Sequence, residues 1–188
     1  SQIGYMIRGL AFVTVAGIAA AIVFTVHQIV VKASLFLVGG MVEESEGTGA
    51  IDSVDGVAHK SPVLAWLFLP AALSLAGFPP FSGFVGKLAL IEAGFAVDGW
   101  VIIGVSLVVS VLTLFSMTKI WGGVFWGKPS PGTPRSIPLG MIVPTAALVI
   151  GGLEIAIGAE PLVEDAERAA TDLVDPATYR GWVLGVVQ

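Results

Sequence analysis

Apolar residues in this chain gather in long blocks, with few polar positions inside them. The longest blocks cover residues 17–41, 62–97, 100–126 and 137–158. A helix needs roughly 20 apolar residues to cross a bilayer, and backbone inside lipid must satisfy its own hydrogen bonds. Because the blocks show no period-two alternation, the pattern predicts helices and not strands. The expected fold class is therefore all-α, a polytopic bundle of transmembrane helices.

The block at residues 62–97 is too long for one straight crossing. As a continuous helix it would measure roughly 54 Å, against a hydrocarbon core of about 30 Å. It is interrupted at residues 77–83, which contain Pro79-Pro80. Proline removes a backbone donor and breaks the helical ladder. We expect an interrupted helix near Pro79-Pro80, with two short helical pieces joined by non-helical backbone at membrane depth.

The segments between the blocks predict loops and breaks. Residues 4–13 are typical of the tail of a helix whose start lies upstream, and a break follows at 14–17. Residues 42–61 are polar and acidic, and we expect a loop with solvated charges there. Residues 127–136 form a second expected loop, rich in proline and glycine.

The last part of the chain differs from the rest. Residues 161–174 are charged and amphipathic, and a short apolar stretch restarts after Asp175-Pro176. The sequence therefore predicts a transmembrane bundle over residues 1–160 and an amphipathic C-terminal tail over residues 161–188.

Composition narrows the function classes. Hydrophobic residues make up 55% of the 188 positions and charged residues 12%, against about 25% charged in a soluble domain. The chain has no cysteine and two histidines, so disulfides and thiolate metal sites are excluded and no cofactor or metal is expected. The net charge is −5. Without a basic patch, a nucleic-acid partner is not expected.

Lys32 lies near the middle of the block at 17–41. Inserting a lysine at the centre of a transmembrane helix costs about 2.5–3.5 kcal/mol, so its presence indicates a structural or functional role. Thr25, Gln28 and Lys32 follow spacings of three and four and share one helix face, which His27 borders. This polar stripe favours a proton relay facing the bundle interior. A lysine paired structurally with an unseen carboxylate is the alternative.

Lys87 follows the Pro-Pro break. Non-helical backbone at membrane depth is tolerated only where it is buried in protein or lines a cavity. A lysine beside such backbone can exchange protons with internal water, which makes Lys87 the second candidate for a proton pathway. A kinked helix with an interfacial lysine is the alternative.

Two further cationic residues, Lys119 and Arg8, give weaker indications of a functional role. Lys119 lies about one turn before Trp121, Phe125 and Trp126, which we expect to form an aromatic belt at the membrane interface. Snorkelling explains Lys119 well, and a place in the pathway is the alternative. Arg8 lies in the expected first helix, and the pattern assigns it no role.

Several stretches resemble the antiporter-like membrane subunits shared by respiratory complex I and Mrp-type cation/proton antiporters. The stretches are residues 1–6, Ser-Gln-Ile-Gly-Tyr-Met; residues 27–37, His-Gln-Ile-Val-Val-Lys-Ala-Ser-Leu-Phe-Leu; and residues 74–87, which run from Ser-Leu-Ala-Gly-Phe-Pro-Pro to Lys87. Within that group the chain is most similar to the D subunits of Mrp antiporters. Lys87 stands where the middle complex I subunit carries a glutamate, and the runs at 114–127 and 175–179 also fit.

The resemblance implies a proton path along a central polar axis. Lys32 would match the lysine of the later half-channel, and Lys87 the terminal lysine on the interrupted helix. The family often has a second histidine where Gln28 stands. The family's earlier half, with its own glutamate–lysine pair, is absent from these 188 residues, so a complete path does not lie in this chain alone.

The resulting hypothesis is a proton-translocating subunit of a multisubunit sodium/proton antiporter in the cell membrane. Its partners would be other subunits of that complex, protons and monovalent cations, with Na⁺ favoured. It would be part of a secondary transporter and not an enzyme. The alternatives are a proton-pumping subunit of complex I or a related membrane hydrogenase, and a passive anchoring subunit in which Lys32 and Lys87 are dispensable. An intramembrane enzyme has no nucleophile–base pair or metal set to support it.

Overall fold

The structure is a computed structural model that describes residues 2–128 and 134–175. Every regular element in these two ranges is helical, which confirms the all-α prediction. The elements are α1 (Gln2–Ala11), α2 (Val15–Glu46), η1 (Ile51–Ser53), α3 (Val57–Lys60), α4 (Pro62–Ala76), α5 (Ser82–Phe95), α6 (Trp100–Ile120), η2 (Trp121–Phe125), α7 (Leu139–Ile157) and α8 (Ala159–Val174).

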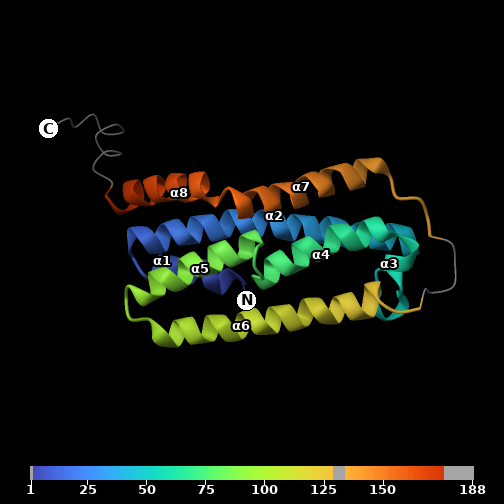
Figure 1. Ribbon diagram of the computed structural model, residues 1–188, viewed down its shortest axis with the longest axis horizontal. Coiled ribbons are helices and arrows are strands. Elements are labelled where there is room, and N and C mark those ends of the chain that lie inside the picture. Colours follow the sequence, from blue (N-terminus) through green and yellow to red (C-terminus); the bar gives the residue numbers. More distant parts are fainter. Residues whose placement is uncertain (1, 129–133, 176–188) are drawn as a thin grey trace.

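The long helix α2 is the axis of the bundle. Its 32 residues measure about 48 Å. Thr14 caps its first turn by accepting a hydrogen bond from the backbone N–H of Gly17 at 3.0 Å, so the helix begins two residues before the predicted span. It packs against α1, α4, α5, α7 and α8, and Figure 1 shows these helices running alongside it.

The predicted interruption is present. Helix α4 ends at Ala76, α5 begins at Ser82, and the two pieces follow one another along α2 (Figure 1). The peptide bond between Pro79 and Pro80 is cis. Neither piece is long enough to cross a bilayer, and together they cover the expected length.

The outer helices α6 and α7 present apolar side chains outward. On α6 only Ile103 and Ser106 are buried, and on α7 only Thr145 and Gly152. By length and composition, α2, α6 continued into η2, and α7 are able to cross a membrane. Because the exposed side chains of α6 are mostly apolar from Trp100 to Phe115, this face suits contact with lipid.

The charged segment after α7 forms the amphipathic helix α8, as the pattern predicts. Its Ala166 and Ala170 pack against Ala19 and Val23 of α2, and its charged residues face away. The short apolar stretch expected after Asp175-Pro176 lies outside the described residues. The division between bundle and tail stays a prediction.

Two predictions at the other end of the bundle are wrong. The acidic loop does not start at residue 42, because α2 continues to Glu46, and Glu46 is not solvated. Its carboxylate lies 2.7 Å from Nζ of Lys60, and both side chains are more than nine-tenths buried. This ion pair ties α3 to the end of α2.

The expected aromatic belt is also wrong for two of its three members. The chain from Trp121 to Phe125 forms a π-helical turn. That turn directs Phe125 into the core, with its ring centroid 4.6 Å from that of Phe68, and Trp121 stacks on both rings. Trp126 alone is exposed, as an interfacial residue should be.

The buried ion pair yields a stability prediction. Glu46→Ala removes the carboxylate that lies 2.7 Å from Nζ of Lys60, and breaking a buried pair from one side costs about 3–5 kcal/mol. Glu44→Ala removes an exposed charge of the same helix turn and should change stability by less than about 0.5 kcal/mol. The test is the thermal denaturation midpoint of the detergent-solubilised whole complex. Equal midpoints for both variants would show that the pair does not hold α3 in place.

Candidate functional site

The centre of the site is the C-terminal end of α4, inside the bundle. A helix leaves its last four carbonyls without partners in the helix. Gly77, at φ +83°, turns the chain so that its N–H donates to the carbonyls of Leu73 and Ser74, and the N–H of Phe78 donates to Leu73. The carbonyls of Leu75 and Ala76 remain. The left-handed backbone at Gly77 suits glycine and little else.

Lys87 of α5 supplies the donors for these two carbonyls. Its ammonium nitrogen lies 2.7 Å from the carbonyl oxygen of Ala76 and 3.2 Å from that of Leu75. The residue is 5% exposed, so Lys87 points into the protein interior as predicted. Within the described part of the chain its hydrogen-bond acceptors are carbonyls and not a carboxylate. The negative end of the α4 dipole further favours a cation here.

A chain of hydroxyl groups crosses the break and ends at His27. Nδ1 of His27 lies 2.9 Å from Oγ of Ser82, which lies 2.9 Å from Oγ of Ser74. Ser74 also accepts the backbone N–H of Gly83 at 3.3 Å. These contacts join α2, α4 and α5. The other ring nitrogen of His27, Nε2, is buried with no partner among the described residues.

The two halves of the interrupted helix meet too closely for any side chain at Gly83. A Cβ there would lie 1.7 Å from the carbonyl oxygen of Ser74 and 3.0 Å from Cε1 of His27. A Cβ at Gly77 would lie 2.6 Å from Cδ of Lys87. The glycines therefore permit the contacts that bring Lys87, His27 and the serines into one cluster.

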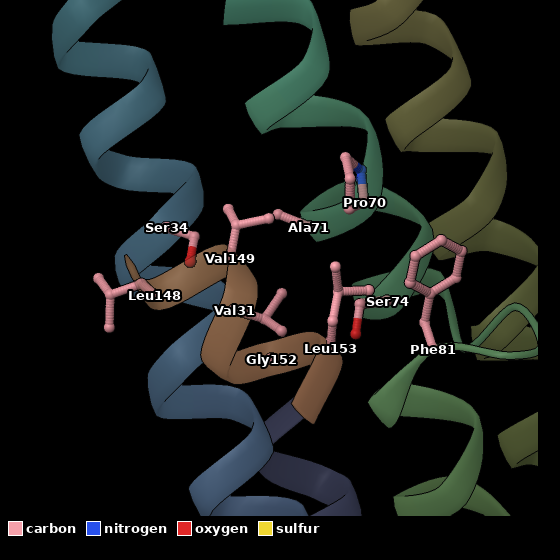
Figure 2. A pocket seen from close by; sticks show the side chains of 10 residues that line it. All are labelled: Val31, Ser34, Pro70, Ala71, Ser74, Phe81, Leu148, Val149, Gly152 and Leu153. Carbon is pink, nitrogen blue, oxygen red and sulfur yellow. The ribbon is translucent and has the colours of Figure 1, made fainter. Parts of the chain in front are cut away.

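A small hollow lies beside this cluster. Figure 2 shows Ser74 and Phe81 on the two sides of the break, with Ser34 and Val31 of α2 and Leu153 of α7 around the same space. Its volume of about 10 Å³ is close to the minimum for one water molecule. The hydroxyls of Ser34 and Ser74 are the polar groups in its lining.

Tyr5 of α1 also borders the Lys87 cluster. Its ring centroid lies 5.5 Å from Nζ of Lys87 and 5.2 Å from the ring of Phe24. Its hydroxyl donates to the carbonyl of Ser106 and lies 2.9 Å from Oγ of Ser110. An aromatic face toward an ammonium stabilises the charge without pairing it.

Lys32 occupies a different position. It is half-buried and lines a groove of about 780 Å³ between α2, α4 and α6. The groove extends along α2 to Glu43 and reaches Ile51 of η1 at the end of the bundle. Leu75, whose carbonyl binds Lys87, also lines it. The groove and the Lys87 cluster are thus adjacent. Among the described residues, no hydrogen bond links Lys32 to Lys87.

The remaining sequence candidates are spread out. Gln28 is fully buried, and its amide nitrogen lies 3.5 Å from Oε1 of Gln2, with its own Oε1 unpartnered among the described residues. Thr25 donates to the carbonyl of Ala21 within its helix. Lys119 is exposed on α6, away from the cluster. The pathway roles of Thr25, Gln28 and Lys119 stay predictions.

Sequence reasoning missed three residues of the cluster: Tyr5, Ser74 and Ser82. A signal was present for the serines, because they flank the break on its two sides. When an interrupted helix continues in nearly the same direction, its flanking residues meet. For Tyr5 there was no such signal, since its contact with Lys87 depends on how α1 packs against α5.

The chemistry available is proton exchange. An ammonium, an imidazole and two hydroxyls lie in one buried cluster, and hydroxyls both donate and accept protons. Among the described residues, no group of three or more histidine, cysteine or carboxylate side chains is placed to hold a metal.

Comparison with known proteins agrees with this geometry. The D subunit of the Na⁺/H⁺ antiporter of Alkalihalophilus pseudofirmus is 39% identical over 186 residues, and that of Bacillus subtilis is 34% identical over 186 residues. Each alignment covers 98% of this chain and 38% of the relative, so the chain spans well under half of their length. A chain in the Mrp complex from Dietzia sp. DQ12-45-1b superimposes with a TM-score of 0.90 at 34% identity, over 95% of this chain and 42% of that one.

A sequence family matches more than half of the chain. Residues 1–113 match the family described as NADH:quinone oxidoreductase/Mrp antiporter, transmembrane. These residues include α1, α2, both pieces of the interrupted helix and most of α6, and therefore Lys32, His27 and Lys87. The chain is an integral membrane protein that belongs to the NADH:quinone oxidoreductase/Mrp antiporter family.

Proposed function

We propose that this chain supplies one half of the proton pathway in a subunit of a multisubunit sodium/proton antiporter. Its relatives of 34–39% identity are named as D subunits of such antiporters, and the similar solved chain comes from an Mrp complex. The family also includes quinone oxidoreductase subunits. Lysine at position 87 and the named relatives favour the antiporter. In this proposal the complete proton path, the transport of sodium and the contacts with partner subunits are properties of the larger assembly.

The observation that supports proton exchange most strongly is the coordination of Lys87. Two carbonyls accept hydrogen bonds from its nitrogen. A neutral amine carries two N–H donors and an ammonium three. The two carbonyls of α4 therefore keep their partners in both protonation states, and the third proton of the ammonium is the one available for exchange. When that proton leaves, the two carbonyls at the end of α4 keep their hydrogen bonds.

His27 and the two serines offer a route for that proton. Ser82 and Ser74 connect His27 to the break beside Lys87. A second positive charge in the same low-dielectric cluster is unfavourable while Lys87 is charged. Protonation of the imidazole would thus favour release from Lys87, so that one proton displaces the next.

The groove at Lys32 offers access from one end of the bundle. It leads from Glu43 and the end of α2 to Lys32, over a rise of about 16 Å along the helix. Its lining adjoins Leu75 and hence the Lys87 cluster. We assign Lys32 to loading of the pathway and Lys87 to the exchange that follows, with internal water between them.

Lys87 provides the first test of this function. Lys87→Ala should abolish proton-coupled transport, and because it also leaves the carbonyls of Leu75 and Ala76 without their donors, its assembly is measured alongside. Lys87→Arg should also fail, because the arginine guanidinium stays protonated and cannot release its proton. Lys119→Ala should be milder, since that lysine is exposed. The measurement is cation-driven pH change in everted vesicles carrying the full complex, with assembly checked on native gels. Normal transport by Lys87→Arg would mean that the charge matters and its exchange does not.

Gly83 provides the second test. Gly83→Ala places a methyl group against the Ser74 carbonyl and must push α4 and α5 apart, which costs about 1–3 kcal/mol or more. Transport should fall steeply, and the thermal midpoint of the complex should drop. Gly104→Ala, on the open face of α6, meets no atom within 4 Å and should leave both properties unchanged. Full transport by Gly83→Ala would show that the close meeting of the two pieces is not required.

A further inference from the structure

Arg8 is a buried cation that lies outside the proposed pathway. Arg8 of α1 is 7% exposed. Its Nη1 donates to the carbonyl of Ile102 at 3.2 Å, and its Cζ lies 5.3 Å from the ring centroid of Tyr5. The ion pairs recorded in the described ranges do not include it. A guanidinium keeps its charge even when buried, so a buried one without an anion is costly.

The unpaired atoms of Arg8 have the geometry of an anion site. Nε and Nη2 are both buried and have no acceptor among the described residues. These two nitrogens direct their N–H groups in parallel along one edge of the planar guanidinium. That fork matches two oxygens of a phosphate or a carboxylate.

Arg8 lines a groove of about 420 Å³ between α1 and α6. The other walls are mainly apolar and include Ile7, Val101, Val105 and Val109. The side chains of Val101 and Val105 are exposed along the outer face of α6. An apolar channel that opens onto a lipid-facing surface fits a hydrocarbon chain better than a polar peptide.

The position along the helices points to the same ligand. Arg8 lies three residues before the end of α1 at Ala11, and its partner Ile102 is the third residue of α6. Both are within about one turn of the helix ends, a depth at which lipid headgroups border the hydrocarbon core. A phosphate at this level would reach the fork while its acyl chain followed the groove.

We propose that the groove between α1 and α6 is a phospholipid site. The Nε and Nη2 donors of Arg8 bind the headgroup phosphate, and one acyl chain lies against Val101, Val105 and Val109. Because Arg8 and Lys87 lie against the ring of the same residue, Tyr5, a bound lipid would hold α1 at the wall of the Lys87 cluster. The site would couple the surrounding membrane to that cluster.

The test counts lipids on the assembled complex. The complex with its full-length subunits is purified in mild detergent, delipidated, and titrated with phosphatidylglycerol, with binding followed by native mass spectrometry. In Arg8→Gln the affinity for lipid at that site should be about tenfold weaker, so that the variant carries one bound lipid fewer per subunit at the same lipid concentration. Arg168→Gln is the matched control, because Arg168 is exposed on α8 and pairs with Glu164 and Asp165; its lipid count should not change.

A second variant keeps the proposal testable if Arg8→Gln does not assemble. Val105→Trp retains Arg8 and fills the exposed groove, so it should lose the same lipid. Unchanged lipid counts in the variants that assemble would overturn the proposal. So would displacement of the lipid by inorganic phosphate alone, or a structure of the complex in which a protein carboxylate occupies the fork of Arg8.

Discussion

The structure depends on how an interrupted helix satisfies its backbone inside a membrane. No water in the hydrocarbon core is available to the four carbonyls that end α4. Two of them accept backbone N–H groups from the turn at Gly77, and the other two accept hydrogen bonds from Lys87. The lysine thus belongs to the backbone hydrogen bonding of the break. This explains why a cation is tolerated at that depth although none of the ion pairs in the described part of the chain gives it a carboxylate.

Under the proposed function, the same contact would also serve proton exchange. A purely structural lysine would suit a carboxylate partner, which holds the charge in place. Carbonyl oxygens accept hydrogen bonds from an amine in either protonation state, which is what the proposed proton exchange at Lys87 requires. Around it, the hydroxyls of Ser74 and Ser82 reach His27, and the Lys32 groove reaches toward the end of the bundle. The break therefore brings a helix end, a buried lysine and the edge of a groove together, which is the arrangement that the proposed proton exchange needs.

Sequence reasoning succeeded where one residue type has one physical consequence. Consecutive prolines break the hydrogen-bond ladder of a helix, so the interruption before Lys87 was predictable from the sequence. It failed where the outcome depends on packing. Glu46 looks like a surface acid until α3 brings Lys60 to it, and Trp121 and Phe125 look interfacial until a π-helical turn directs them inward. Arg8 had no assigned role, because the α1–α6 groove that it lines forms only in the folded bundle.

The central claim concerns what surrounds Nζ of Lys87 in the complete assembly. The direct measurement is a cryo-electron microscopy map of the whole complex, at a resolution that shows ordered water. The account predicts hydrogen bonds from Nζ to the carbonyls of Leu75 and Ala76, with a water molecule or the His27–serine chain as its third partner. A carboxylate from another segment paired with Nζ, in a site closed to water, would contradict it.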